Sequence, residues 1–90
     1  MPASSEATIT LAGDLHARPA GALSVAAAKF DATVRLSVGA SEADARSVLA
    51  VMQLGASSGQ QVTVSAAGPD AEAAVAALVD ILADVTTAGA

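Results

Sequence analysis

Alanine is the commonest residue in this chain, and it limits the size of any core that the chain can build. The 90 residues include 25 alanines, about half of a hydrophobic fraction of 53%. That leaves 23 larger apolar residues, enough for one small domain with a light core. We expect a single domain over residues 1–90, with its core between about residues 7 and 85. Val, Leu and Ile should form this core around the only aromatic residue, Phe30.

The rest of the composition excludes several classes of function. With no cysteine and one histidine, the chain has no disulfide framework and no Cys-based or all-histidine metal site, and it implies no cofactor. Its only cations are Arg18, Lys29, Arg35 and Arg46, too few to follow a nucleic-acid backbone. The N-terminus lacks the features of a signal peptide, and the uncharged stretch 47–69 is too polar for a membrane span. We expect a monomeric cytoplasmic protein.

Hydrophobic periodicity predicts seven elements between polar ends. Strands are expected at 8–11, 33–38 and 61–65, with a weak edge strand at 41–45, and helices at 16–30, 47–54 and 71–85. Residues 1–6 and 86–90 are predicted to be tails. Strands with one polar face favour an antiparallel sheet that is wet on one side. The predicted fold class is an α+β open-faced two-layer sandwich, β-α-β-β-α-β-α, with three helices on one face of a four-stranded antiparallel sheet.

Three residues are predicted to set helix ends. Ser47 precedes an apolar helical run and is a favoured N-cap, because its hydroxyl can accept an unpaired backbone N–H. Gly55 follows the same run, where a glycine in the left-handed conformation is expected. Asp70 follows Gly68-Pro69 and is predicted to cap the last helix.

The segment Leu15-His16-Ala17-Arg18-Pro19-Ala20 carries the chemistry. His16 is predicted at the start of a helix, where unpaired backbone N–H groups favour an anion. Arg18 can place two N–H donors on phosphate oxygens. An imidazole is a nucleophile near neutral pH without a separate base. The combination suits a group that accepts and returns a phosphoryl group. A small hydrolase is disfavoured because no general base accompanies the histidine. The alternative to any of these functions is an ordinary surface residue, which a lone histidine at a helix start more often is.

Two segments resemble the signatures of one family. Leu15-His16-Ala17-Arg18-Pro19-Ala20 is similar to the active-site motif of HPr, the histidine-containing phosphocarrier of the phosphoenolpyruvate:sugar phosphotransferase system. A second segment resembles the regulatory-serine pattern of the same family. It consists of Ala40-Ser41 and, after a gap of four residues, Arg46–Gly55. The spacing between the motifs fits, and the resemblance covers about residues 7–85.

The resemblance implies a carrier that is phosphorylated on Nδ1 of His16 by phospho-Enzyme I and that passes the group to EIIA proteins of sugar permeases. Arg18 and the backbone N–H groups of Ala17 and Arg18 would hold the phosphate. Ser47 would be a regulatory site for HPr kinase/phosphorylase. The implied partner surface, with Ser47 at its rim, comprises Ala20, Leu49, Met52 and Gln53.

Asp14 departs from the family pattern, which usually has glycine at this position. A carboxylate facing an incoming phosphate would repel it, so we expect Asp14 to point away. Two other functions stay open. The chain could serve a different phosphorelay, such as a nitrogen-regulatory or dihydroxyacetone-kinase branch, or it could be a regulatory module that acts through Ser47 alone.

For Met52, plain core packing is as good an interpretation as partner contact.

Overall fold

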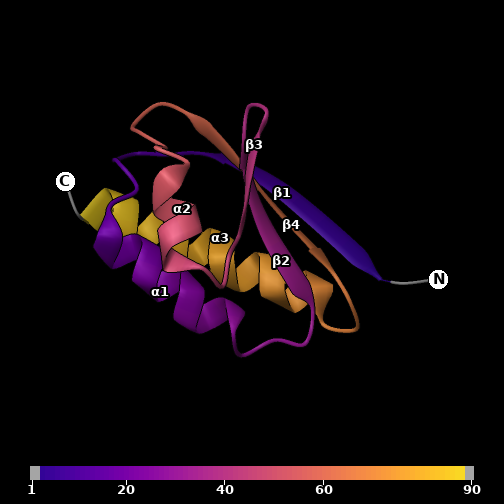
Figure 1. Ribbon diagram of the computed structural model, residues 1–90. Coiled ribbons are helices and arrows are strands. Elements are labelled where there is room, and N and C mark those ends of the chain that lie inside the picture. The colour runs from indigo at the N-terminus through magenta and orange to yellow at the C-terminus, as the bar shows by residue number, and fades with distance from the viewer. Residues whose placement is uncertain (1–2, 89–90) are drawn as a thin grey trace.

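The computed structural model describes residues 3–88, and it has the predicted order of elements around one antiparallel sheet. The elements are β1 (Ser4–Thr10), α1 (Ala17–Ala27), β2 (Thr33–Val38), β3 (Ser41–Asp44), α2 (Val48–Gln53), β4 (Gln61–Ala67) and α3 (Ala71–Ala88). The strand order is β1-β4-β2-β3, and every neighbouring pair is antiparallel. The three helices lie on one face of the sheet (Figure 1). The predicted α+β sandwich is therefore confirmed.

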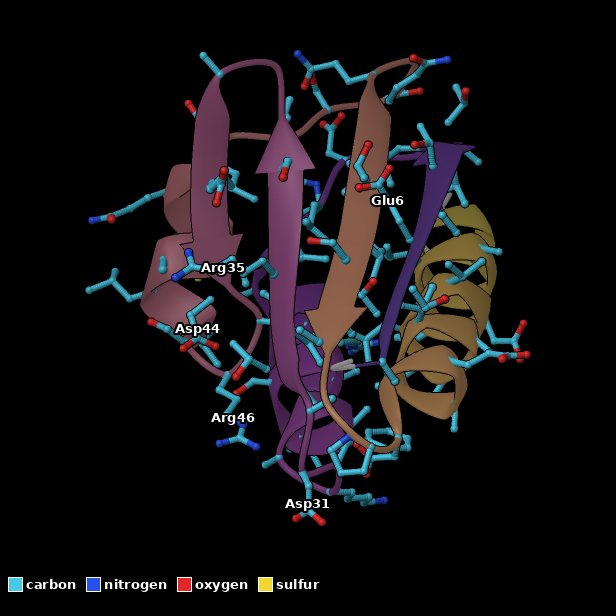
Figure 2. The ribbon with its side chains drawn as sticks, turned by 90° about the vertical axis from the view of Figure 1, so that its right-hand side faces the viewer. Glu6, Asp31, Arg35, Asp44 and Arg46 are labelled. Carbon is cyan, nitrogen blue, oxygen red and sulfur yellow. The ribbon has the colours of Figure 1, made fainter. Side chains whose placement is uncertain are left out.

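The outer face of the sheet carries polar side chains (Figure 2). Thr8 on β1 and Thr63 on β4 are paired across the strands, and their hydroxyl oxygens are 2.9 Å apart. On the inner face, Val34 and Leu36 of β2 are fully buried, as are Val62 and Val64 of β4. Alternation along each strand thus divides a wet face from a face that packs under α1 and α3.

Alanine contributes more to the core than the sequence suggested. Nine of the twenty buried hydrophobic residues in the described chain are alanines, and the largest fully buried side chains are Leu and Val. Phe30 is only half-buried and packs against the edge of this core. The expectation of a core built around Phe30 is therefore wrong. Small side chains let the helices lie close to the sheet, so no aromatic residue is needed to fill the space between them.

The element boundaries differ most from the prediction in three places. β1 begins at Ser4 because residues 4–6 continue the ladder against Ser65–Ala67 of β4, so those residues are not a tail. α1 ends at Ala27, and the N–H groups of Lys29 and Phe30 then bond three residues back, to Ala26 and Ala27. α3 continues to Ala88, past the predicted end at residue 85.

Asp70 connects the start of α3 to the loop between α1 and β2. Its backbone carbonyl accepts the first α3 hydrogen bond, from the N–H of Ala74. Its carboxylate accepts from the N–H of Asp31 (2.9 Å) and from the N–H of Ala32 (2.7 Å), so the side chain makes a tertiary contact where a helix cap was predicted. Next to it, Gly68 has φ of +143°, and a Cβ there would lie 2.8 Å from the Cα of Ala32. Only glycine allows this close approach.

Asp70 gives the fold a predictable dependence on acid. The hydrogen bond from the Asp31 N–H lowers the pKa of the Asp70 carboxyl from its ordinary 3.8, and the Ala32 N–H and the charge of Arg46 lower this pKa further. A depressed pKa in the folded state stabilises the protein above the unfolded pKa of about 3.9, and this stabilisation is lost as pH falls through the folded pKa. We expect Asp70→Asn to melt below the wild type at neutral pH.

The difference in melting temperature between the wild type and Asp70→Asn should stay constant down to about pH 4. It should narrow at lower pH, because the wild-type carboxylate then becomes protonated. Thermal melts over a pH series measure this. Asp80→Asn, on the exposed side of the same helix, is the charge-matched control. A gap between wild type and Asp70→Asn that persists unchanged into strong acid would contradict the assignment.

Candidate functional site

His16 occupies the N-cap position of α1, and its side chain is 77% exposed. Its backbone is extended, with φ of −86° and ψ of −175°, and its carbonyl accepts the first α1 hydrogen bond, from the N–H of Ala20. Among the described residues, the imidazole makes no capping hydrogen bond to the helix. The N–H groups of Ala17 and Arg18 precede that first intrahelical bond, so they face the helix end as unpaired donors.

Buried neighbours hold this exposed histidine in place. Leu15 is 6% exposed and donates its N–H to the carbonyl of Ala56 at 3.0 Å, while Pro19 on the other side is buried in the first turn of α1. Pro19 fits there because its missing N–H would have had no intrahelical partner. The chain therefore enters and leaves position 16 through packed residues while the imidazole stays in solvent.

A second set of bonds fixes the loop before the histidine against the loop after α2. Leu11 donates its N–H to the carbonyl of Gln60 and accepts from the N–H of Gly59, both at 2.9 Å, which extends the pairing of β1 with β4. The hydroxyl of Ser58 donates to the carbonyl of Ala12, and the N–H of Ser58 donates to Oδ1 of Asp14 at 2.8 Å. The two loops thus form one rigid support for His16.

Asp14 does not point away from the site, and that expectation is wrong. Its second carboxylate oxygen, Oδ2, lies 3.8 Å from Nε2 of His16, with the two side chains 51% and 77% exposed. The carboxylate lies beside Nε2 because the Ser58 N–H holds its other oxygen. Sequence reasoning identified Asp14 only as a departure from the usual glycine, since no local signal links position 14 to position 58.

A shallow depression beside His16 joins the start of α1 to the end of α2. It has a volume of about 320 Å³, and it is lined by Asp14–Ala17, Met52 and Gly55–Ser57. Gly55 has φ of +62°, which confirms the predicted left-handed residue after α2. The turn at Gly55 ends α2 with its last residues next to the histidine. Among the described residues, Arg18, Leu49 and Gln53 are exposed around this depression without lining it.

The exposed apolar surface of α2 comprises Val48, Leu49 and Met52, of which Leu49 is 66% and Met52 43% exposed. Met52 is therefore a surface residue, and core packing does not account for it. Ala20 is 0% exposed and belongs to the core, so we do not retain it in a partner surface. Three large apolar residues of this six-residue helix therefore lie in solvent.

Ser47 is the N-cap of α2, as predicted. Its side-chain hydroxyl accepts from the N–H of Ala50 at 3.1 Å. The residue before it, Arg46, is fixed at two points: its carbonyl accepts from the hydroxyl of Ser24 on α1 (2.6 Å), and its guanidinium donates to the carbonyl of Phe30, just after α1 (2.7 Å). The start of α2 is thereby held to the same helix that begins at His16.

A larger depression lies at the far end of the outer sheet face. Its volume is about 530 Å³, and it is lined by Ser4–Glu6, Thr33, Arg35 and Ser65–Ala67. It contains no nucleophile comparable with His16. In the described chain, no cluster of three or more His, Asp or Glu residues is arranged to hold a metal ion. No helix of residues 3–88 is both long and apolar enough to cross a membrane.

An open-faced sandwich with an exposed histidine at a helix start defines the class of small phosphocarrier domains. The chain matches, over residues 3–84, the family model described as the PTS HPr component phosphorylation site. The chain therefore belongs to the HPr family.

Individual relatives agree with this assignment. The chain is 38% identical over 81 residues to the multiphosphoryl transfer protein of Xanthomonas campestris pv. campestris. The match covers 90% of this chain and 10% of that relative, so the chain spans about a tenth of the relative's length. HPr-C-His from Thermoanaerobacter tengcongensis has 38% identity and a TM-score of 0.79, over 87% of this chain and 90% of that one. HPr from Bacillus anthracis str. Ames has 27% identity and a TM-score of 0.82, and the match covers 89% of this chain and 98% of that one.

Proposed function

We propose that this protein is a phosphocarrier of the phosphoenolpyruvate-dependent sugar phosphotransferase system. It accepts a phosphoryl group from phospho-Enzyme I on Nδ1 of His16 and passes it to EIIA proteins, with no turnover or cofactor of its own. The observation that carries the proposal is the 77% exposed imidazole on the N-cap of α1, which is not used for capping among the described residues. A nucleophile that two different proteins must reach in turn has to be exposed.

The chemistry needs only what the site supplies. The lone pair of Nδ1 forms a bond to phosphorus as the bond between phosphorus and the donor breaks, and the electron pair of that bond returns to the donor. Transfer to EIIA repeats the step with His16 as the leaving group. Neutral imidazole is nucleophilic without a base, and its phosphorylated form is a good donor. A hydrolase would in addition need a group to activate water, so carriage of the phosphoryl group fits the site better.

The start of α1 supplies the counter-charge for the phosphate. The unpaired N–H groups of Ala17 and Arg18 lie at the positive end of the helix macrodipole, and α1 has no acidic residue in its first turn. The exposed Arg18 guanidinium adds a charge that can bind two phosphate oxygens at once. These groups would stabilise the phosphorylated state during its transit between partners.

We assign the partner surface to exposed residues of α2, which are Leu49, Met52 and Gln53, and of these Met52 lines the depression beside His16. Enzyme I and EIIA proteins would cover this surface in turn, and the flexible side chain of Met52 suits contact with more than one partner. Ser47 lies at the rim of this surface, and we propose it as a regulatory phosphorylation site for HPr kinase/phosphorylase.

The carrier assignment is tested by incubating the protein with Enzyme I and labelled phosphoenolpyruvate. We expect one labelled group per chain, with the acid lability and alkali stability of a phosphoramidate, and none in His16→Ala. His16 is the only imidazole in the chain, so a phosphohistidine can form at no other residue. Acid-labile label on His16→Ala would rule out His16 as the acceptor. A wild type that accepts no label from Enzyme I would instead favour a different phosphorelay or a module acting through Ser47.

Arg18→Ala should slow transfer from Enzyme I by at least about tenfold with little change in melting temperature, because the exposed guanidinium acts on the phosphate and not on the core. The transfer rate of Arg18→Lys should lie between those of the wild type and Arg18→Ala, since a point charge replaces the bidentate group. Arg35→Ala is the matched control. It removes the same charge from the outer sheet face (Figure 2), where Arg35 is 3.5 Å from Glu42. Normal transfer rates in Arg18→Ala would exclude Arg18 from the mechanism.

Ser47→Asp should slow transfer from Enzyme I while the melting temperature holds. An aspartate can take over the cap on the Ala50 N–H and favours a helix start by roughly 0.3–1 kcal/mol. The same charge lies at the rim of the Leu49 and Met52 surface, where a partner would have to desolvate it.

Ser47→Ala should show the opposite behaviour. It removes the cap, which costs about 1 kcal/mol of stability, and adds no charge, so transfer should stay near the wild-type rate. Phosphotransfer rates and thermal melts on the two variants separate the effects. Unchanged transfer in Ser47→Asp would place the start of α2 outside the contact surface.

A further inference from the structure

The carboxylate of Asp14 is fixed beside one particular nitrogen of the candidate acceptor. Oδ1 accepts the Ser58 N–H at 2.8 Å, and Oδ2 lies 3.8 Å from Nε2 of His16. Ser58 is itself held, because its hydroxyl donates to the carbonyl of Ala12, and the N–H of His16 donates to the carbonyl of Asp14 at 3.2 Å. Both partners of the 3.8 Å contact are therefore anchored to the same loop pair.

A carboxylate in this position distinguishes the two nitrogens of a neutral imidazole. Neutral histidine carries its proton on one ring nitrogen and a lone pair on the other, and only the nitrogen with the lone pair is a nucleophile. A carboxylate accepts hydrogen bonds and donates none when ionised, so it favours the tautomer with the proton on the nearer nitrogen. A distance of 3.8 Å is too long for a direct hydrogen bond, but the charge of the carboxylate acts across it.

We propose that Asp14 is a positioning residue for phosphoryl transfer, which keeps the proton of neutral His16 on Nε2 and presents the lone pair of Nδ1 to the donor. The inference rests on the proposed carrier function. It assigns the two sides of the ring to opposite charges: the helix start and Arg18 serve the phosphate on Nδ1, and the carboxylate serves the proton on Nε2.

The proposal is tested on the unphosphorylated protein carrying ¹⁵N-labelled histidine. Nitrogen chemical shifts in mildly alkaline buffer, where imidazole is neutral, give the ratio of the Nε2–H to the Nδ1–H tautomer of His16. We expect this ratio to be highest in the wild type, several-fold lower in Asp14→Gly, and lowest in Asp14→Asn. Asparagine keeps an oxygen for the Ser58 N–H but turns its NH₂ group toward Nε2, where two donors would face each other. A merely structural role for Asp14 would not produce this order.

Glu6→Gln is the matched control, since it removes one negative charge from the outer sheet face (Figure 2) and should leave the ratio unchanged. Thermal melts verify that each variant is folded. A tautomer ratio in folded Asp14→Gly and Asp14→Asn equal to that of the wild type overturns the proposal, even if transfer slows. A wild type that Enzyme I does not phosphorylate overturns the carrier function. In that case the tautomer ratio of His16 still decides whether Asp14 keeps the proton on Nε2.

Discussion

The bonding between the loop that follows β1 and the loop that follows α2 is the constraint on which the site depends. Leu11 and Leu15 are buried at either end of the first loop, and their backbone groups pair with Gln60, Gly59 and Ala56 of the second. This pairing fixes the backbone on the N-terminal side of His16, while Pro19 and Ala20 fix it on the other side. An imidazole can stay in solvent and keep a defined direction only because its neighbours are buried. Rigid neighbours reduce the entropy that must be lost when a partner aligns the ring with its phosphoryl group.

The small side chains of the core have a consequence for the surface. Buried alanines such as Ala20, Ala27 and Ala74 let α1 pack against α3 and α3 against the sheet, so the larger apolar residues of α2 are not required to fill the interior. Val51 alone of that helix is fully buried, and Leu49 and Met52 stand in solvent beside the site. A light core and an exposed apolar contact surface are therefore two results of the same composition. The bond from Ser24 to the Arg46 carbonyl keeps this surface in register with the start of α1.

The electrostatic arrangement of the site has two sides. Under the proposed carrier function, the positive end of α1 and the exposed Arg18 would hold the phosphate, while the carboxylate of Asp14 lies beside Nε2 of the ring. The protein has a net charge of −5, but the charges close to His16 affect a bound phosphate more than this net charge does. Salt screens interactions between charges that are more than about 8–10 Å apart.

The sequence by itself determined the order of the elements, the wet and buried faces of the strands, the cap at Ser47 and the turn at Gly55. Each of these depends on residues within one turn or one strand. It also determined that one histidine would lie at a helix start. The tertiary structure alone decided that Phe30 leaves the helix, that Ala20 is buried, and that the carboxylates of Asp14 and Asp70 bind backbone groups 44 and 38–39 residues away. These outcomes depend on which loops the folded sheet brings together, and no local pattern of propensity or periodicity encodes such pairings.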